Sequence, residues 1–361
     1  MILDGKMRAF LKKYRAGLAT FFLFFALWLL ALRFVAEAPI WFDLPQSDDN
    51  GYLYAGLHFF GGEINADWSP LYSFWLFLLY HLRPDVTRVY YLSMQAVGIL
   101  LPLFSFLFLR NLKINPVFSS LTAVFLLAGY AFWQVEPRVT GFAALVLVFL
   151  WWLTSLPAKR WQRLWLLALS SILLAYARPE FFLLTPVFFL IALGYFLKQK
   201  ISLDKRKGRF FLLTGAPFLL LLLWWGIPFS GSRTIYAFGQ HYAQNVDHCI
   251  TQGASENMAW EEILARDFND PKNMLDVLQA NPRNFLRHLQ CNLTSTPKSL
   301  LKVMFGSAWG SSWLLIRLWL LFILYRLLVH PNAIRERLID LWQKDALLLP
   351  ILSLGIFTLD I

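Results

Sequence analysis

The chain has 361 residues, of which 58% are hydrophobic, 17% are aromatic and only 15% are charged. A soluble domain carries about a quarter charged residues, so the composition excludes an ordinary soluble protein and indicates a surface that mostly contacts lipid. The net charge of +11 does not indicate a nucleic-acid partner, because the Lys and Arg residues form short clusters between apolar runs rather than a separate basic domain.

The first apolar run covers residues 16–32 and follows a cationic N-terminus. It is too long for the hydrophobic region of a signal peptide, and no small-residue cleavage site ends it. We therefore predict a first membrane helix with its N-terminus in the cytoplasm. Further runs approach the roughly 20 residues that a span needs, near 86–109, 115–134, 139–156, 161–177, 180–197, 210–228, 303–328 and 346–361.

The distribution of charge orients these spans. Five segments are assigned to the cytoplasm, namely 1–15, 110–114, 157–163, 198–209 and 326–345. Together they hold 20 of the 33 Lys and Arg residues but only five of the 22 acidic residues, as the positive-inside rule requires. The sequence thus predicts a multi-pass protein of the cell (inner) membrane, with membrane lipids around it and with residues 37–70 and 229–302 on the extracytoplasmic side.

The resulting fold class is an all-α polytopic membrane protein with about nine transmembrane helices. We expect interfacial helices in the first outer loop, 37–70, and a mostly helical second outer loop, 229–302. Within the second loop, amphipathic helices between 260 and 289 should break at Asp270-Pro271 and again near Asn281-Pro282.

Three parts follow one another along the chain. Residues 1–228 form a transmembrane module that includes the first outer loop, residues 229–302 form an extracytoplasmic loop, and residues 303–361 form C-terminal transmembrane helices. The last apolar run ends at Ile361 without a polar tail, so we expect the C-terminal part to be truncated.

Two adjacent carboxylates, Asp48 and Asp49, stand just outside the first predicted span. In one interpretation Ser47 or Asp48 only caps a short helix over residues 50–60. In the other, one carboxylate is a catalytic base held at the membrane surface. Leu53, Leu57 and Phe60, at helical spacing, would lay that helix flat on the interface.

A resemblance to a known family rests on several short motifs in a fixed order. After the acidic pair come Trp68-Ser69-Pro70-Leu71-Tyr72, then Glu136-Pro137, then Ala177-Arg178-Pro179-Glu180. Residues 15–230 resemble the GT-C membrane glycosyltransferases, and among them the family 39-like protein mannosyltransferases, the aminoarabinose transferases and the bacterial Rgt-type transferases. The chain departs from them at Ser69-Pro70, where two prolines are frequent, and at Asp49, where Glu is common.

The resemblance implies a glycosyltransferase that uses a polyprenyl-phosphate sugar donor. The acceptor is a hydroxyl of a lipid, a polysaccharide or a protein on the extracytoplasmic face, and no cofactor is expected. Asp48 would take the proton from that hydroxyl as it attacks the anomeric carbon with inversion, and Asp49 would position the acceptor.

The leaving lipid phosphate needs positive charge as its bond breaks. Arg138 and Arg178, at outer ends of spans, are candidates because a guanidinium matches phosphate geometry, and Arg233 is a third. Glu136 and His241 are candidates for positioning. The alternative is structural: Arg138 would pair with its neighbour Glu136, and Arg178 with Glu180.

Both cysteines of the chain, Cys249 and Cys291, fall in the second outer loop. An oxidising compartment favours a disulfide between them, whereas two separate buried thiols would be the alternative.

Absent motifs narrow the remaining functions. The sequence has no phosphate-binding G-x-x-x-x-G-K-[ST] loop, no Asp-x-Asp and no His or Cys cluster with zinc spacing, so no metal site is predicted. A transporter or lipid flippase is the alternative function, although such proteins usually carry charge inside their spans. A non-catalytic relative of the transferases is a third possibility.

Overall fold

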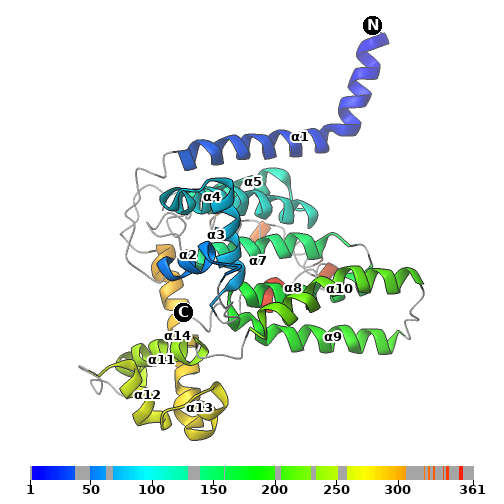
Figure 1. The fold of residues 1–361 in the computed structure, drawn as a ribbon. Coiled ribbons are helices and arrows are strands. Elements are labelled where there is room, and N and C mark those ends of the chain that lie inside the picture. Colours follow the sequence, from blue (N-terminus) through cyan, green and yellow to red (C-terminus); the bar gives the residue numbers. More distant parts are fainter. Residues whose placement is uncertain are drawn as a thin grey trace. The chain divides into compact units, whose positions relative to one another are not determined.

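In the computed structural model, every regular element of the described residues is a helix. The described residues are 2–36, 49–61, 68–128, 139–157, 159–199, 205–228, 233–250 and 258–305, with a few positions between 321 and 352. No strand occurs in these ranges, so the predicted all-α class is confirmed for this part of the chain (Figure 1).

Four described helical segments are long and apolar enough to cross a membrane. They are Gly17–Ala36, Val86–Asn111, Pro179–Lys198 and Lys205–Trp225. Each falls on a predicted span, which supports the membrane-protein class. Two shorter apolar helices, over Pro116–Leu127 and Val139–Ser155, coincide with two more predicted spans. The predicted spans at 303–328 and 346–361 lie almost wholly outside the described residues.

Contacts divide the chain into two compact units. The first unit comprises residues 1–49, 78–156 and 309–341. The second comprises residues 50–77, 157–308 and 342–361.

In the first unit, α4 (Val86–Asn111) packs against α1 (Ile2–Ala36), α5 (Pro116–Ala128) and α7 (Val139–Ser155). Apolar side chains fill these contacts, with Phe106 fully buried between α1 and α5. The helix begins after Asp85, whose carboxylate accepts a hydrogen bond from the backbone N–H of Arg88 at 3.1 Å, as an N-cap residue does.

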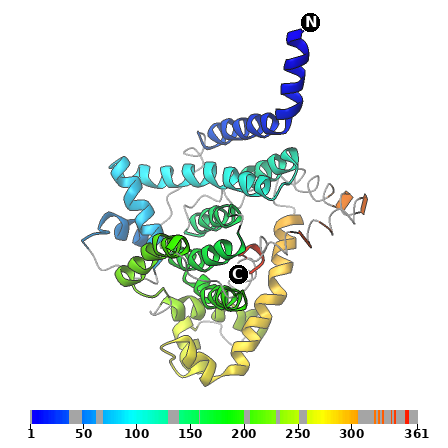
Figure 2. The same cartoon turned by 90° about the vertical axis from the view of Figure 1, so that its right-hand side faces the viewer.

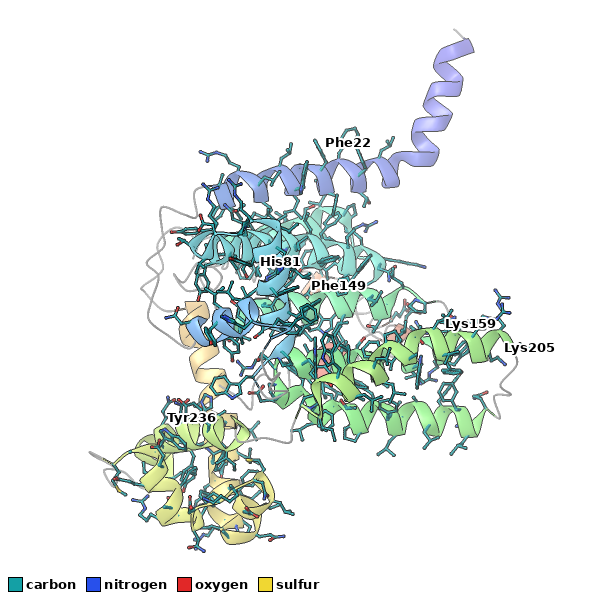
Figure 3. The ribbon with its side chains drawn as sticks, viewed as in Figure 1. Phe22, His81, Phe149, Lys159, Lys205 and Tyr236 are labelled. Carbon is teal, nitrogen blue, oxygen red and sulfur yellow. A yellow bond between two sulfur atoms is a disulfide. The ribbon has the colours of Figure 1, made fainter. Side chains whose placement is uncertain are left out.

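In the second unit, α8 (Arg160–Ala177), α9 (Leu184–Lys198) and α10 (Lys205–Trp225) run alongside one another (Figure 2). A short 3-10 helix, η2 (Pro179–Leu183), joins α8 to α9. Figure 3 shows Lys159 and Lys205 at the same end of these helices, with Tyr236 toward the other end. Lys159 and Lys205, one basic residue before α8 and one at the start of α10, thus lie on the same side.

Helix α2 (Asp49–Leu57) packs closely against α3 (Pro70–Leu82). A Cβ atom added to Gly56 would lie 2.9 Å from the backbone oxygen of Ser73, so only glycine fits there without a shift. Leu53 is buried, and it cannot therefore belong to a lipid-facing stripe with Phe60, which is exposed. The predicted flat orientation of this helix, built on Leu53, Leu57 and Phe60, is wrong in that respect, because α3 covers one side of α2.

The α11–α14 segment of the second unit, residues 233–305, contains five helical elements within its described ranges. They are α11 (Arg233–Asn245), the π-helical turn η3 (Val246–Ile250), α12 (Trp260–Phe268), α13 (Met274–Ala280) and α14 (Pro282–Phe305). Their core is an apolar cluster around Tyr242, Ile263 and Phe268. A Cβ atom added at Gly239 would clash with the ring of Trp260, so α11 and α12 approach each other closely at this glycine.

The breaks predicted in this segment are confirmed. Helix α12 ends at Asn269, which adopts the left-handed conformation (φ 59°), and Asp270 follows with φ 54°. Asn273 then caps α13 by accepting hydrogen bonds from the backbone N–H groups of Leu275 and Asp276. Asn281 and Pro282 separate α13 from α14.

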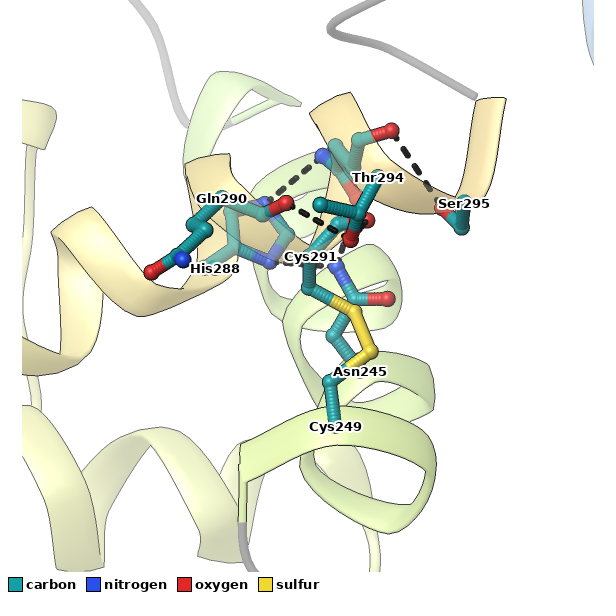
Figure 4. The surroundings of a disulfide bond; sticks show 8 residues. Asn245, Cys249, His288, Gln290, Cys291, Thr294 and Ser295 are labelled. Carbon is teal, nitrogen blue, oxygen red and sulfur yellow. Dashed lines mark hydrogen bonds between the residues drawn. A yellow bond between two sulfur atoms is a disulfide. The ribbon is translucent and has the colours of Figure 1, made fainter. Parts of the chain in front are cut away.

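A disulfide joins Cys249 in η3 to Cys291 in α14 (Figure 4). The two Cα atoms are 6.0 Å apart, within the range that a disulfide allows. This is the pairing that the sequence predicts. It closes a loop with a sequence separation of 42 residues, so it restrains the unfolded chain between η3 and α14.

We expect the Cys249→Ala/Cys291→Ala variant to destabilise the α11–α14 segment by about 3–4 kcal/mol, the chain-entropy estimate for a loop of this length. Thermal unfolding of the purified protein in detergent, followed by intrinsic fluorescence, measures the effect. Reductant should lower the midpoint of the wild type toward that of the variant and leave the variant unchanged. Equal midpoints for the oxidised wild type and the variant would contradict this role.

Candidate functional site

Arg178 occupies the joint between α8 and η2. Its backbone is extended (φ −146°, ψ 113°) and its N–H donates to Leu174 at 2.8 Å, the last helical bond of α8. Pro179 explains this geometry, because a proline pushes the preceding residue out of the helical region. The side chain of Arg178 therefore projects from the end of α8 rather than from its lateral surface.

Arg178 forms a two-point ion pair with Glu180. Its Nε donates to Oε2 at 3.2 Å and its Nη2 donates to Oε1 at 3.4 Å. The two side chains are only 20% and 22% exposed. The fork geometry of a guanidinium on a carboxylate holds both groups in place, and the pair is partly shielded from water. This is the pairing that the structural alternative predicted, and it leaves a cation fixed at the end of α8.

His241 on α11 lies within the electrostatic reach of this pair. Burial lowers the pKa of the His241 imidazole, the positive charge of Arg178 lowers it further, and Glu180 partly offsets both effects. Arg178 and His241, two residues singled out separately from the sequence, are thus close enough to interact electrostatically. At neutral pH the imidazole is uncharged and can accept or donate a proton.

A buried polar network supports the same face of α11. The amide Nδ2 of Asn245, one turn after His241, contacts Nδ1 of His288 at 2.9 Å and donates to Oδ1 of Asn292 at 2.6 Å. The Nδ2 atom of Asn292 is 3.3 Å from Nε2 of His288. Figure 4 shows this network beside the disulfide.

The His288 ring is almost completely buried, with 5% of its surface exposed. Burial and the nearby His241 lower the pKa of His288 to about 4. The ring is therefore neutral at physiological pH, and protonating it would place a charge in an enclosed site. A neutral ring keeps the contact between α11 and α14 intact.

One residue after His241, Tyr242 anchors α11 to α12. Its hydroxyl donates to Oδ2 of Asp267 at 2.7 Å. Burial raises the pKa of the Tyr242 phenol, and Asp267 raises it further. Burial also disfavours ionisation of Asp267, but hydrogen bonds from Arg266 and Tyr242 outweigh this effect and lower its pKa.

Aromatic rings connect α2, the Trp68 turn and α11. The Trp68 ring lies 6.2 Å from Tyr52 on α2 and 6.4 Å from Tyr236 on α11. Ser69, the next residue, has φ 49° and is completely buried. Pro70 then begins α3, a position at which proline is preferred. Trp68 and Ser69 thus form a turn before α3, and the Trp68 ring packs between α2 and α11.

Several predicted site residues cannot be placed at the level of side chains. Asp48, Glu136 and Arg138 lie outside the described residues. Asp49 begins α2 and Arg233 begins α11, and for these two only the backbone is described.

Three polar residues of the cluster were not predicted from the sequence: Asn245, His288 and Asn292. Nothing in their local sequence marks them, because His288 and Asn292 share a helix with exposed leucines and arginines. Only the contact between α11 and α14 reveals their role.

The assembled cluster combines a fixed guanidinium, a carboxylate and a neutral imidazole. A guanidinium in a partly enclosed position suits an anionic oxygen, and a neutral imidazole suits hydroxyl or phosphate groups as a hydrogen-bonding partner. Among the described residues, no group of three or more His, Cys, Asp and Glu side chains gathers as a metal site would require.

Fold and cluster together define a helical membrane protein with a polar cluster at the end of α8. Comparison with known proteins adds no closer assignment: no family model, no curated protein and no solved structure matches the chain.

The low pKa of His288 predicts a pH dependence of stability. The unfolded imidazole binds a proton near pH 6.5, whereas the folded one stays neutral down to about pH 4. The unfolded state therefore binds more protons in this window, and stability should fall as pH drops from about 6.5 to 4, by up to about 3 kcal/mol.

Thermal midpoints measured across that pH range test this expectation. His288→Gln should flatten the decline, whereas His58→Gln, at an exposed histidine after α2, should preserve it. Equal slopes for the wild type and His288→Gln would show that another group is responsible.

Proposed function

We propose that the chain is a membrane glycosyltransferase of the GT-C type. It transfers a sugar from a polyprenyl-phosphate donor to an acceptor hydroxyl on the extracytoplasmic face, with inversion. The acceptor belongs to a lipid, a polysaccharide or a protein. In this proposal about nine helices cross the cell membrane, and the polyprenyl tail lies among them while the sugar projects outward.

The observation that carries the proposal is the ion pair of Arg178 and Glu180 at the end of α8, together with its electrostatic interaction with His241. Arg178 is held by Glu180 at 3.2 Å, and its charge acts on His241. A donor phosphate at the end of a membrane helix would find there a fixed cation and a neutral hydrogen-bonding ring. Charge developing on the leaving phosphate is stabilised best by such preorganised groups.

The orientation of the second unit supports the proposal. Lys159 and Lys205 mark one end of α8 and α10 (Figure 3), and Arg178 terminates α8 at the opposite end. If the basic end is cytoplasmic, as the positive-inside rule favours, the cluster faces outward. That is the side on which a lipid-linked sugar is presented.

In the proposed reaction, Asp48 removes the proton of the acceptor hydroxyl as its oxygen attacks the anomeric carbon. The bond from that carbon to the donor phosphate oxygen breaks, and the phosphate leaves with the electron pair. Asp49, in the first turn of α2, positions the acceptor. Packing of Tyr52 on Trp68, and of Trp68 on Tyr236, connects this helix to α11 within one unit.

Asp48→Asn should abolish most transfer from a polyprenyl-phosphate sugar, with a loss of about 10²–10⁴-fold in rate, because a general base contributes that much. Asp49→Asn should cost less. Both rates are measured with labelled donor in reconstituted vesicles, and equal expression and thermal midpoints serve as controls. Near-normal turnover by Asp48→Asn would rule out the assigned base.

Arg178→Lys keeps the charge and loses the planar fork, so donor binding should still weaken and KM for the donor should rise. Arg266→Lys is a matched control, since Arg266 also pairs with a neighbouring carboxylate, that of Asp267. Normal donor kinetics in both Arg178→Lys and Arg178→Ala would remove the phosphate-binding role.

A further inference from the structure

Helix α14 runs across the direction of the apolar helices of its unit. Helices α8, α9 and α10 lie along the horizontal in Figure 1 and point toward the viewer in Figure 2, whereas α14 (yellow to orange) runs up the page in both. A membrane crossed by α9 and α10 therefore has α14 extending along its surface rather than through it.

The side chains of α14 divide its circumference into two faces. The face toward α11 and η3 buries His288, Cys291 and Asn292, which form the polar network and the disulfide. The opposite face exposes Leu286 and Leu293, at 61% and 55%.

Arg283 and Arg287 are exposed beside these leucines. At 3.6 residues per turn, Leu286 and Leu293 lie within about 20° of each other around the helix, and the arginines lie about 60–120° away from them. The exposed face thus has an apolar edge and a basic edge that run in parallel. This division is characteristic of helices that lie in a membrane interface.

Neither edge has a partner within the described part of the chain. No described carboxylate lies within ion-pairing distance of Arg283 or Arg287. The preceding helix α13 exposes two more leucines, Leu275 and Leu278, at 60% and 43%. Four exposed leucines on two consecutive short segments are more than scattered surface residues account for.

We propose that α14 docks on the outer leaflet of the membrane that the chain crosses. Leu286 and Leu293 enter the boundary between headgroups and acyl chains, and Arg283 and Arg287 bind anionic phosphate headgroups. The charge of the two arginines is complementary to anionic lipid, and each basic residue near such a surface strengthens its attraction. This docking is independent of the chemistry proposed for Arg178 and His241.

Nitroxide labels report depth directly. Leu286→Cys and Leu293→Cys are labelled in the full chain, where the native cysteines are held in the disulfide. Glu261→Cys on α12, at an exposed acidic position, is the matched control. Collision rates with oxygen, which partitions into lipid, and with a water-soluble nickel chelate are measured in vesicles of phosphatidylcholine with and without phosphatidylglycerol.

The ratio of oxygen to nickel collisions should be severalfold higher at positions 286 and 293 than at 261. Phosphatidylglycerol should raise it further, and Arg283→Gln/Arg287→Gln should remove that increase. Ratios equal to that of the control would overturn the docking. Labels shielded from both reagents would also overturn it, because such shielding indicates a protein partner instead of lipid. A high ratio that neither phosphatidylglycerol nor the arginine variants change would overturn the headgroup contact. Sugar transfer plays no part in these readings, so they stand or fall separately from the enzyme assignment.

Discussion

The arrangement of the polar cluster depends on the proline that ends α8. Pro179 has no backbone N–H, so it cannot continue the hydrogen-bond ladder of α8, and its ring holds Arg178 in an extended conformation. Without that break, Arg178 would lie on the side of a continuous helix, among lipid or apolar neighbours. Because of this break the chain turns through η2. The carboxylate of Glu180, two residues after Arg178, can then accept hydrogen bonds from the guanidinium.

The cluster also requires that α11 be held in a fixed position, since His241 interacts with Arg178 only while α11 stays near the end of α8. Three attachments achieve this, one to α12 and two to α14. Tyr242 bonds to α12 through Asp267, Asn245 bonds to α14 through His288 and Asn292, and the disulfide ties the turn after α11 to α14. Each lies within about two turns of His241 along the chain. Polar networks of this kind stabilise a single arrangement only when every member has a partner.

How much of this could be predicted from sequence varies with the range of the interaction. The breaks at Asp270-Pro271 and Asn281-Pro282 were predictable because turn residues act locally. The cysteine pair was predictable because only two candidates exist. Helix α3 was not predicted, and the burial of Leu53 was missed, because the packing of α2 against α3 depends on the close approach at Gly56.

The polar cluster shows the same limit more sharply. Arg178 was identifiable from its position beside Pro179 at the end of an apolar run. His288, 47 residues after His241 along the chain, carries no local sign that it will be buried against α11. A helix with exposed leucines and arginines on one face has the pattern of a surface helix, and the importance of its other face becomes clear only in three dimensions.

The disulfide also has a consequence for how the protein is made. Cys249 emerges from the ribosome before Cys291, and in the proposed orientation both must leave the cytoplasm before an oxidant can join them. Helix α14 therefore cannot be locked to η3 until translocation of the intervening chain is complete. The disulfide would therefore report correct insertion. In the proposed orientation, a molecule that retains two free thiols has either stalled in the translocation channel or inserted with the opposite topology.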